Sequence, residues 1–277
     1  MKAHTTMDEQ ERKSMIKQTF NTVAEGYDNR ALRYFADSAY HLADVLSLKG
    51  DERLLDVATG TGSNALVFAQ HLPAGHVTGI DFSAGMLSQA RAKAERASIH
   101  NIAFIEMDMQ QLAFPDGHFD AASCAFGIFF VEDMVGLLKH IASKVKKGGR
   151  VGITSFYDSA FHPLAELFFN RIEQFGIERP AVSWKRVSDE EKSTALYASA
   201  NLGDVRVVRK NLGYYLSSAD EWWELIWYAG FRGLVNQLAP QDMERFKRAH
   251  LQEIQQLASS DGIWLDVEVL YTTGTRL

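Results

Sequence analysis

The residues best placed to do chemistry lie in the segment Leu54–Leu66, LLDVATGTGSNAL. Its apolar start predicts a buried strand, Gly60 and Gly62 predict a tight turn, and Ser63 predicts the start of a helix. Glycines let a backbone approach a ligand closely, and the first turn of a helix offers unpaired N–H groups. The same glycine spacing also fits the dinucleotide-binding pattern, so the turn alone leaves the ligand open.

Carboxylates at the ends of successive predicted strands narrow the choice of ligand. Asp56 ends the first strand beside the turn, where it would repel a pyrophosphate but suit a ligand with an ammonium group. Asp81 ends the second strand, where an acidic side chain accepts hydrogen bonds from ribose hydroxyls. Asp108 closes the third strand, where it can accept from an exocyclic amine while Met109 packs on a ring. A cationic nucleoside fits this set better than a dinucleotide does.

Each of these carboxylates also has a purely structural explanation. Asp56 would cap the turn, Asp81 would cap the next helix, and a solvated strand end would tolerate Asp108. Ser83 is the better helix cap, and the coordinated spacing of the motifs favours the ligand roles.

The elements that must position these residues alternate between short apolar runs and helices after Gly50. This alternation predicts a parallel sheet with helices on both faces. A final strand over Ile263–Thr273 alternates apolar and acidic residues, which predicts one solvated face and an edge or antiparallel position. We therefore expect an α/β fold with a Rossmann-like, seven-stranded, mostly parallel sheet. The other strands are predicted over Arg53–Val57, His76–Ile80, Ile102–Met107, Phe119–Cys124, Arg150–Phe156 and Val205–Val208.

Composition excludes several classes of protein. The formal net charge is −6, from 29 basic and 35 acidic residues, which argues against nucleic acid as the partner. The single cysteine, Cys124, excludes a disulfide framework and a cysteine-rich zinc site, and we expect it to be a buried apolar side chain. The N-terminus lacks the apolar stretch of a signal peptide, and the longest apolar run is too short to span a bilayer. We expect a cytoplasmic protein with no membrane span and no metal.

Several stretches in a fixed order carry a family resemblance. They are FNTVAEGYD, LLDVATGTG, GIDFSAGML, MDMQQLAFPDGHFD, AFGIFFVED and KKGGRVGITSF, between Thr19 and Phe156. In these stretches the chain resembles the class I S-adenosylmethionine-dependent methyltransferases. Within them it is most similar to the ubiquinone/menaquinone C-methyltransferase group (methyltransferase type 11). The resemblance implies methyl transfer from S-adenosylmethionine, with S-adenosylhomocysteine as product.

The resemblance places the glycine turn around the methionine part of the donor. It implies that Asp56 binds the methionine amino end, and that Thr61 and the backbone around Gly60 and Gly62 line the methionine part. Ala58 stands where the family most often has its first glycine, although alanine is familiar in the quinone group.

The resemblance also implies contacts to the nucleoside part of the donor. Asp81 would bind the ribose, and Asp108 with Met109 the adenine. Tyr27 would close over the donor from the N-terminal helices, although packing in the core explains this aromatic residue equally well. The remaining positions implied to line the donor are Phe82, Met86 and Ala125.

Beyond Phe156 the sequence carries no recognised substrate signature. His162 follows the fifth strand and is the best-placed general base, but a structural histidine at the start of a helix explains it equally well. Phe126 is expected to contact the acceptor. Trp223 and Trp227 lie in the densest aromatic stretch, which would either pack in the core or between subunits, or line a pocket for a flat apolar acceptor.

We interpret the 277 residues as one methyltransferase domain. Residues 1–50 are predicted to form N-terminal helices, and residues 51–156 the donor-binding core. Residues 157–202 and 212–260 are predicted to form helical cap insertions, and residues 203–211 and 261–277 the last strands.

The predicted function is methylation of a quinone-like, phenolic or secondary-metabolite acceptor on oxygen or carbon, with this small-molecule acceptor as the partner. One alternative is a nicotinamide-dependent oxidoreductase with the same glycine turn, which Asp56 disfavours. Another is an S-adenosylmethionine-binding protein that does not methylate, such as a cyclase. The acceptor and the oligomeric state are not determined by the sequence, and a homodimer is one option.

Overall fold

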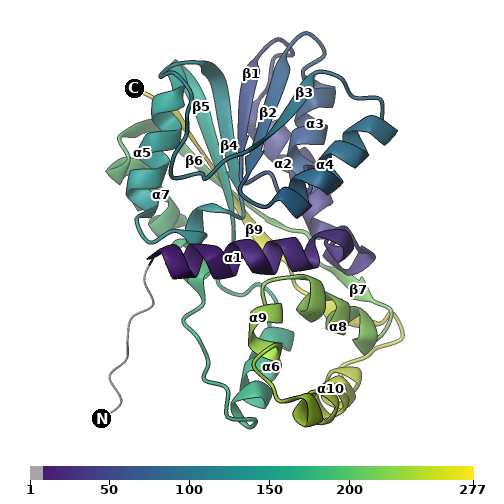
Figure 1. Cartoon of the computed structure of the whole chain (residues 1–277). Coiled ribbons are helices and arrows are strands. Elements are labelled where there is room, and N and C mark those ends of the chain that lie inside the picture. Colours follow the sequence, from purple (N-terminus) through teal and green to yellow (C-terminus); the bar gives the residue numbers. More distant parts are fainter. Residues whose placement is uncertain (1–8) are drawn as a thin grey trace.

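The central sheet has seven strands in the order β3-β2-β1-β4-β5-β9-β6 (Figure 1). The computed structural model describes residues 9–277, so residues 1–8 of the predicted N-terminal unit lie outside the described residues. Neighbours among the first five strands pair in parallel, and β9 pairs antiparallel with β5 and β6. This confirms the predicted sheet. The strands are β1 (Arg53–Val57), β2 (His76–Asp81), β3 (Ile102–Glu106), β4 (Phe119–Ala125), β5 (Val145–Phe156), β6 (Leu202–Asn211) and β9 (Glu268–Arg276).

The predicted final strand is divided in two. Its first part is β8 (Ile263–Leu265), which pairs with β7 (Tyr214–Leu216) in a separate two-stranded sheet. Its second part, β9, is antiparallel as predicted but lies inside the large sheet. The edge is β6 instead, whose first residues alternate between less and more exposed positions.

Helices cover both faces of the sheet. The connections β1–α3–β2–α4–β3 and β4–α5–β5 run in opposite directions from β1. Right-handed crossovers therefore place α3 (Ser63–His71) and α4 (Ala84–Arg96) on one face and α5 (Met134–Lys144) on the other. On these faces α2 (Tyr34–Leu46) packs beside α3, and α7 (Glu190–Ser199) packs beside α5.

A helical cap lies beyond the end of the sheet, with α1 (Glu9–Val23) crossing between them (Figure 1). The cap consists of α6 (Leu164–Glu173), α8 (Ala219–Tyr228), α9 (Arg232–Val235) and α10 (Pro240–Gln255). The predicted cap segment 157–202 differs from this, because α7 packs on β6 and β9. There the Tyr197 hydroxyl donates to the Thr272 carbonyl at 2.7 Å. Short 3-10 helices span Ala24–Gly26, Arg30–Leu32, Ile128–Phe130 and Ser183–Val187.

Within residues 9–277, no helix combines the length and the apolar character needed to cross a membrane.

Candidate active site

A cavity of about 450 Å³ lies where the carboxyl ends of the strands meet α1 and the helical cap. The ends of β2, β4 and β5 contribute Asp81, Ala125 and Phe156 to its wall. The position agrees with the general rule for open parallel sheets, in which ligands bind at the point where the strand order reverses. Here β1 is that point, because it pairs with both β2 and β4.

The turn after β1 is held in shape by Asp81. Gly60 and Gly62 have φ angles of 56° and 81°, a left-handed conformation that favours glycine. The Gly60 N–H donates to Asp81 Oδ2 and the Ser83 N–H to Oδ1, each at 2.9 Å. Burial raises the pKa of Asp81 to about 6. Asp81 also lines the cavity, so the lone pairs left on its oxygens can accept from a ligand's hydroxyls.

Asp56 lies behind the turn and is not among the residues that line the cavity. Its oxygens accept hydrogen bonds from the hydroxyls of Ser123 and Thr59, each at 2.6 Å, and its side chain is 1% exposed. Burial raises the pKa of Asp56 to about 6, against the lowering effect of these bonds. The geometry favours a role in holding Thr59, which does line the cavity, over direct contact with a ligand.

We predict that Asp56→Asn weakens donor binding by the same factor whether or not the ligand carries an α-amino group. Losing one charge-assisted bond to the turn should cost about tenfold in affinity. Calorimetry with S-adenosylhomocysteine and with its analogue lacking the α-amino group should therefore show the same loss for both. A loss confined to the amine-bearing ligand would instead support the direct contact implied by the family resemblance.

Helix α1 is fastened to the β3 edge by polar contacts. Lys13 Nζ donates to Asp108 Oδ2 at 2.9 Å, and Lys17 pairs with Glu106 at 2.8 Å. The Gln110 amide donates to Glu9 at 2.8 Å. Because Lys13 and Asp108 both line the cavity, an adenine amine directed at Asp108 would share this carboxylate with Lys13.

The structure brings most of the predicted donor-site residues to this one wall. Thr61 is among them, although its hydroxyl donates to Asp28 at 2.7 Å. Tyr27 stacks on Phe35 with ring centroids 5.2 Å apart. Gly62 is absent from the wall and has a packing role, because a Cβ there would lie 3.0 Å from that of Ala90. The predicted residues that line the cavity are Tyr27, Ala58, Gly60, Thr61, Asp81, Phe82, Met86, Asp108, Met109, Ala125 and Phe126.

Sequence reasoning missed Asn64, which lies in the first turn of α3 and lines the cavity. Its Oδ1 atom is buried and accepts no hydrogen bond from the described residues. A buried acceptor without a partner is unfavourable, and an ammonium or N–H group of a ligand would satisfy it. This orphaned oxygen beside the turn fits the methionine end of S-adenosylmethionine, as the Asp81 carboxylate fits its ribose.

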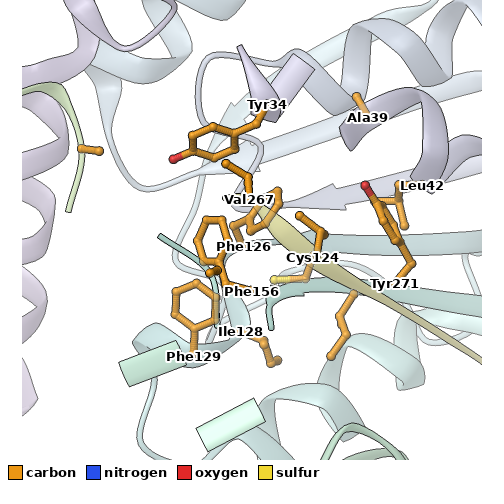
Figure 2. Packing of buried hydrophobic residues seen from close by; sticks show 14 of the residues in the cluster. Tyr34, Ala39, Leu42, Cys124, Phe126, Ile128, Phe129, Phe156, Val267 and Tyr271 are labelled. Atoms are coloured by element: carbon orange, nitrogen blue, oxygen red, sulfur yellow. The ribbon is translucent and has the colours of Figure 1, made fainter. Parts of the chain in front are cut away.

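The other half of the cavity is aromatic and draws on the cap. Figure 2 shows Phe126 and Phe156 side by side below Tyr34, with Phe129 beyond them. The rings of Phe126 and Phe156 lie 4.7 Å apart between centroids. The apolar and aromatic residues of this half include Tyr34, Phe35, Phe130, Phe161, Phe169, Val182, Trp184, Leu225, Phe231 and Leu234.

Phe126 stands between the two halves with an unusual backbone. Its φ angle is 52°, which is rare for an aromatic residue and is found where surrounding structure enforces it. The Phe126 N–H donates to the carbonyl and the hydroxyl of Thr154, each at 3.1 Å. Phe35 meets the Phe126 ring edge-on at 5.1 Å. These contacts hold the ring at the junction of the strand ends and the aromatic half.

The structure does not bring His162, Trp223 or Trp227 to the cavity wall. The His162 side chain is exposed, which leaves it without access to a ligand in the cavity. Trp223 and Trp227 stack on each other at 6.0 Å, and Trp223 also packs against Phe246 of α10. Helical spacing explains this, because Leu225 lines the cavity from the side of α8 opposite to these two tryptophans.

Comparison with known proteins agrees with this geometry. Residues 54–149 match the family model described as a methyltransferase domain. This match, the sheet and the relatives described next show that the chain belongs to the class I S-adenosylmethionine-dependent methyltransferases. It is therefore an enzyme that methylates a small-molecule acceptor, and the comparisons do not favour the oxidoreductase or cyclase alternatives.

Two curated relatives and one solved structure illustrate the similarity. The demethylmenaquinone methyltransferase of Thermus thermophilus is 36% identical over 56% of this chain and 74% of its own. The aklanonic acid methyltransferase DauC of a Streptomyces species is 29% identical over 65% of this chain and 83% of its own. The YcgJ protein of Bacillus subtilis shares the fold, with a TM-score of 0.59 and 20% identity over 87% of this chain and 98% of its own.

Proposed function

We propose that the acceptor is a neutral, flat, largely apolar aromatic molecule of the quinol or polyketide-phenol type, methylated on oxygen or carbon. The observation that carries this is the aromatic half of the cavity, where the rings of Phe126, Phe156 and Phe231 are among the lining groups. Phenylalanine rings pack well on planar apolar ligands and offer neither a hydrogen-bond donor nor an ion-pair partner to an anionic group. The name of the Thermus thermophilus relative refers to a quinone-type acceptor, demethylmenaquinone.

S-Adenosylmethionine supplies an activated methyl group on a sulfonium, so the main task of the protein is alignment in a dry site. Asp81 would hold the ribose, Asn64 the amino-acid end, and Asp108 with Met109 the adenine. Phe126 would separate donor and acceptor and orient the acceptor face. Alignment of this kind contributes about 7–11 kcal/mol in favourable cases.

The acceptor is proposed to lose its proton without help from a protein base. Among the described residues that line the cavity, the ionisable groups are Arg12, Lys13, Tyr27, Tyr34, Asp81 and Asp108. Burial raises the pKa of both tyrosines, which makes them poor bases. The two carboxylates have the donor roles given above. An acidic phenol or enol would therefore supply its own nucleophile.

A donor-dependent screen tests this proposal. Quinols, phenols, enolisable diketones and amines are incubated with the enzyme and S-adenosylmethionine, and mass spectrometry detects the gain of one methyl group. Methylation of quinols or acidic phenols with a rate that rises through the acceptor's own pKa is expected. Turnover confined to amines or to charged aliphatic acceptors would contradict the proposal.

We further predict that His162→Ala retains the turnover of the unmodified enzyme on the identified acceptor. The ring is exposed and lies outside the cavity wall, so its removal leaves donor and acceptor contacts in place. Steady-state kinetics over pH 5–9 is the measurement. A loss of about 10²-fold or more, as expected when a general base is removed, would restore the base assignment.

A further inference from the structure

A second cavity, of about 410 Å³, lies in the helical cap and is lined by residues in and just after α6 and by residues of α10. These two helices are neighbours in the cap (Figure 1). The α10 residues in its wall follow helical spacing, so they share one face of that helix. We call this cavity the arginine groove, and define it by Arg171, Gln174, Phe175, Arg245, Arg248, Ala249 and Gln252. None of these residues lines the methyl-transfer cavity.

The polar groups of the arginine groove are the guanidinium groups of three arginines and the amides of Gln174 and Gln252, and no carboxylate forms part of its wall. Arg171 pairs with Glu253 at 2.9 Å, and Arg245 pairs with Asp242 at 3.1 Å. The guanidinium of Arg248 is exposed and has no hydrogen bond or ion pair with the described residues. Two of the three guanidinium groups of the groove are therefore paired with a carboxylate, and the third, that of Arg248, is not.

Arg171 provides a second, independent observation. Its Nη1 donates to Gln174 at 3.3 Å and its Nη2 to Glu253 at 2.9 Å, which fixes the plane of the guanidinium. Its Nε atom is buried and finds no acceptor among the described residues. A buried donor on a charged group is unfavourable without a partner, and Arg171 forms part of the groove wall, so we infer an oxygen ligand in the groove as the partner of this atom.

We propose that the arginine groove binds a phosphate-type oxyanion. Guanidinium groups match the oxygens of phosphate in geometry and charge, and donors from two helices can reach a tetrahedral anion from several directions. Arg248 supplies the unpaired charge and Arg171 Nε the fixed donor. Because the ligand would bridge α6 and α10, and Phe169 of α6 lines the methyl-transfer cavity, its binding stabilises the wall of the acceptor half.

The test uses the full chain and inorganic phosphate, with sodium chloride at matched ionic strength as reference. We expect a saturable rise in Tm with phosphate, and an apparent affinity at least about tenfold weaker in Arg248→Gln. Lys247→Gln is the matched control, because it removes the same charge from the neighbouring residue, whose ammonium lies 5.0 Å from the Trp223 ring and outside the groove. Its affinity should be unchanged.

A second arm separates free phosphate from a lipid headgroup as the source of the anion. The protein is sedimented with vesicles of phosphatidylglycerol or of phosphatidylcholine. If the protein pellets with the anionic vesicles and Arg248→Gln abolishes this pelleting, the ligand is a lipid headgroup. If phosphate binding saturates and the protein does not pellet, the ligand is a free phosphate. The proposal is overturned if neither effect is seen, or if Lys247→Gln weakens binding as much as Arg248→Gln. None of these outcomes depends on methyl transfer.

Discussion

Asp81→Ala is expected to weaken binding of S-adenosylhomocysteine by roughly 10²–10⁴-fold, since two charge-assisted bonds to the ribose hydroxyls, at about 1.5–3 kcal/mol each, together contribute about 3–6 kcal/mol. The change also releases the N–H groups of Gly60 and Ser83, which Asp81 holds at 2.9 Å. Calorimetry measures the loss. Glu95→Gln is the control, because this carboxylate on α4 is exposed and does not line the cavity. Equal affinities of Asp81→Ala and the unmodified protein would remove the ribose assignment.

The protonation of Asp81 adds a pH dependence to the same prediction. With a pKa of about 6 in the donor-free protein, the carboxylate is ionised above that pH and protonated below it. Ribose hydroxyls and a cationic donor favour the ionised form, so donor affinity should fall as the pH is lowered through 6. Asp56 titrates in the same range, so the profile is compared with that of Asp81→Asn. The part that disappears in this variant belongs to Asp81.

Phe126→Ala is expected to lower kcat/KM for methyl transfer on the order of 10²-fold while leaving affinity for S-adenosylhomocysteine nearly unchanged. The ring is almost fully buried and contacts Phe35 and Phe156 at the junction of the two halves of the cavity. Its removal lets the acceptor shift, and a displacement of about 1 Å can cost this much. Steady-state kinetics and calorimetry on the same preparation separate the two effects.

A stability loss must be separated from this effect, because deleting a buried ring destabilises the fold by about 3–5 kcal/mol. Phe114→Ala is the matched control. The Phe114 ring packs edge-on against Phe119 at 5.1 Å and lies outside the cavity. Phe114→Ala should lower Tm, and at temperatures below its unfolding transition it should leave kcat/KM unchanged. If Phe126→Ala behaved in the same way, the ring would be a packing residue only.

The donor half of the site could be predicted because its residues occur at strand ends. The predicted strand Arg53–Val57 coincides with β1, and Asp81 is the last residue of β2, a strand buried from Val77 onward, where the turn toward the next helix begins. Polar residues at the carboxyl ends of parallel strands meet at one edge of the sheet whatever the rest of the chain does. Asp56 shows the limit of this reasoning, since its place in the sequence did not reveal that Ser123 and Thr59 occupy its oxygens.

The acceptor half could not be predicted, because no repeating pattern tells which side of a cap helix faces a cavity. In α8 the tryptophans are the residues whose type indicates a pocket for a flat acceptor, yet Trp222 is fully buried and donates to His250 at 2.8 Å. Leu225, a residue with no chemical signal, lines the cavity. Asn64 carried one usable signal, as a polar residue in the first turn of a helix after a ligand-binding glycine turn.

The fastening of α1 to the β3 edge bears on how fast the enzyme can turn over. A product nucleoside bound as proposed would leave from beneath a helix whose Lys13 and Lys17 ion pairs are partly exposed, and salt screens such pairs. If departure of the product limits the cycle, added sodium chloride should accelerate steady-state turnover while leaving the first turnover unchanged. The ion pairs of one surface helix would then set the rate of steady-state turnover.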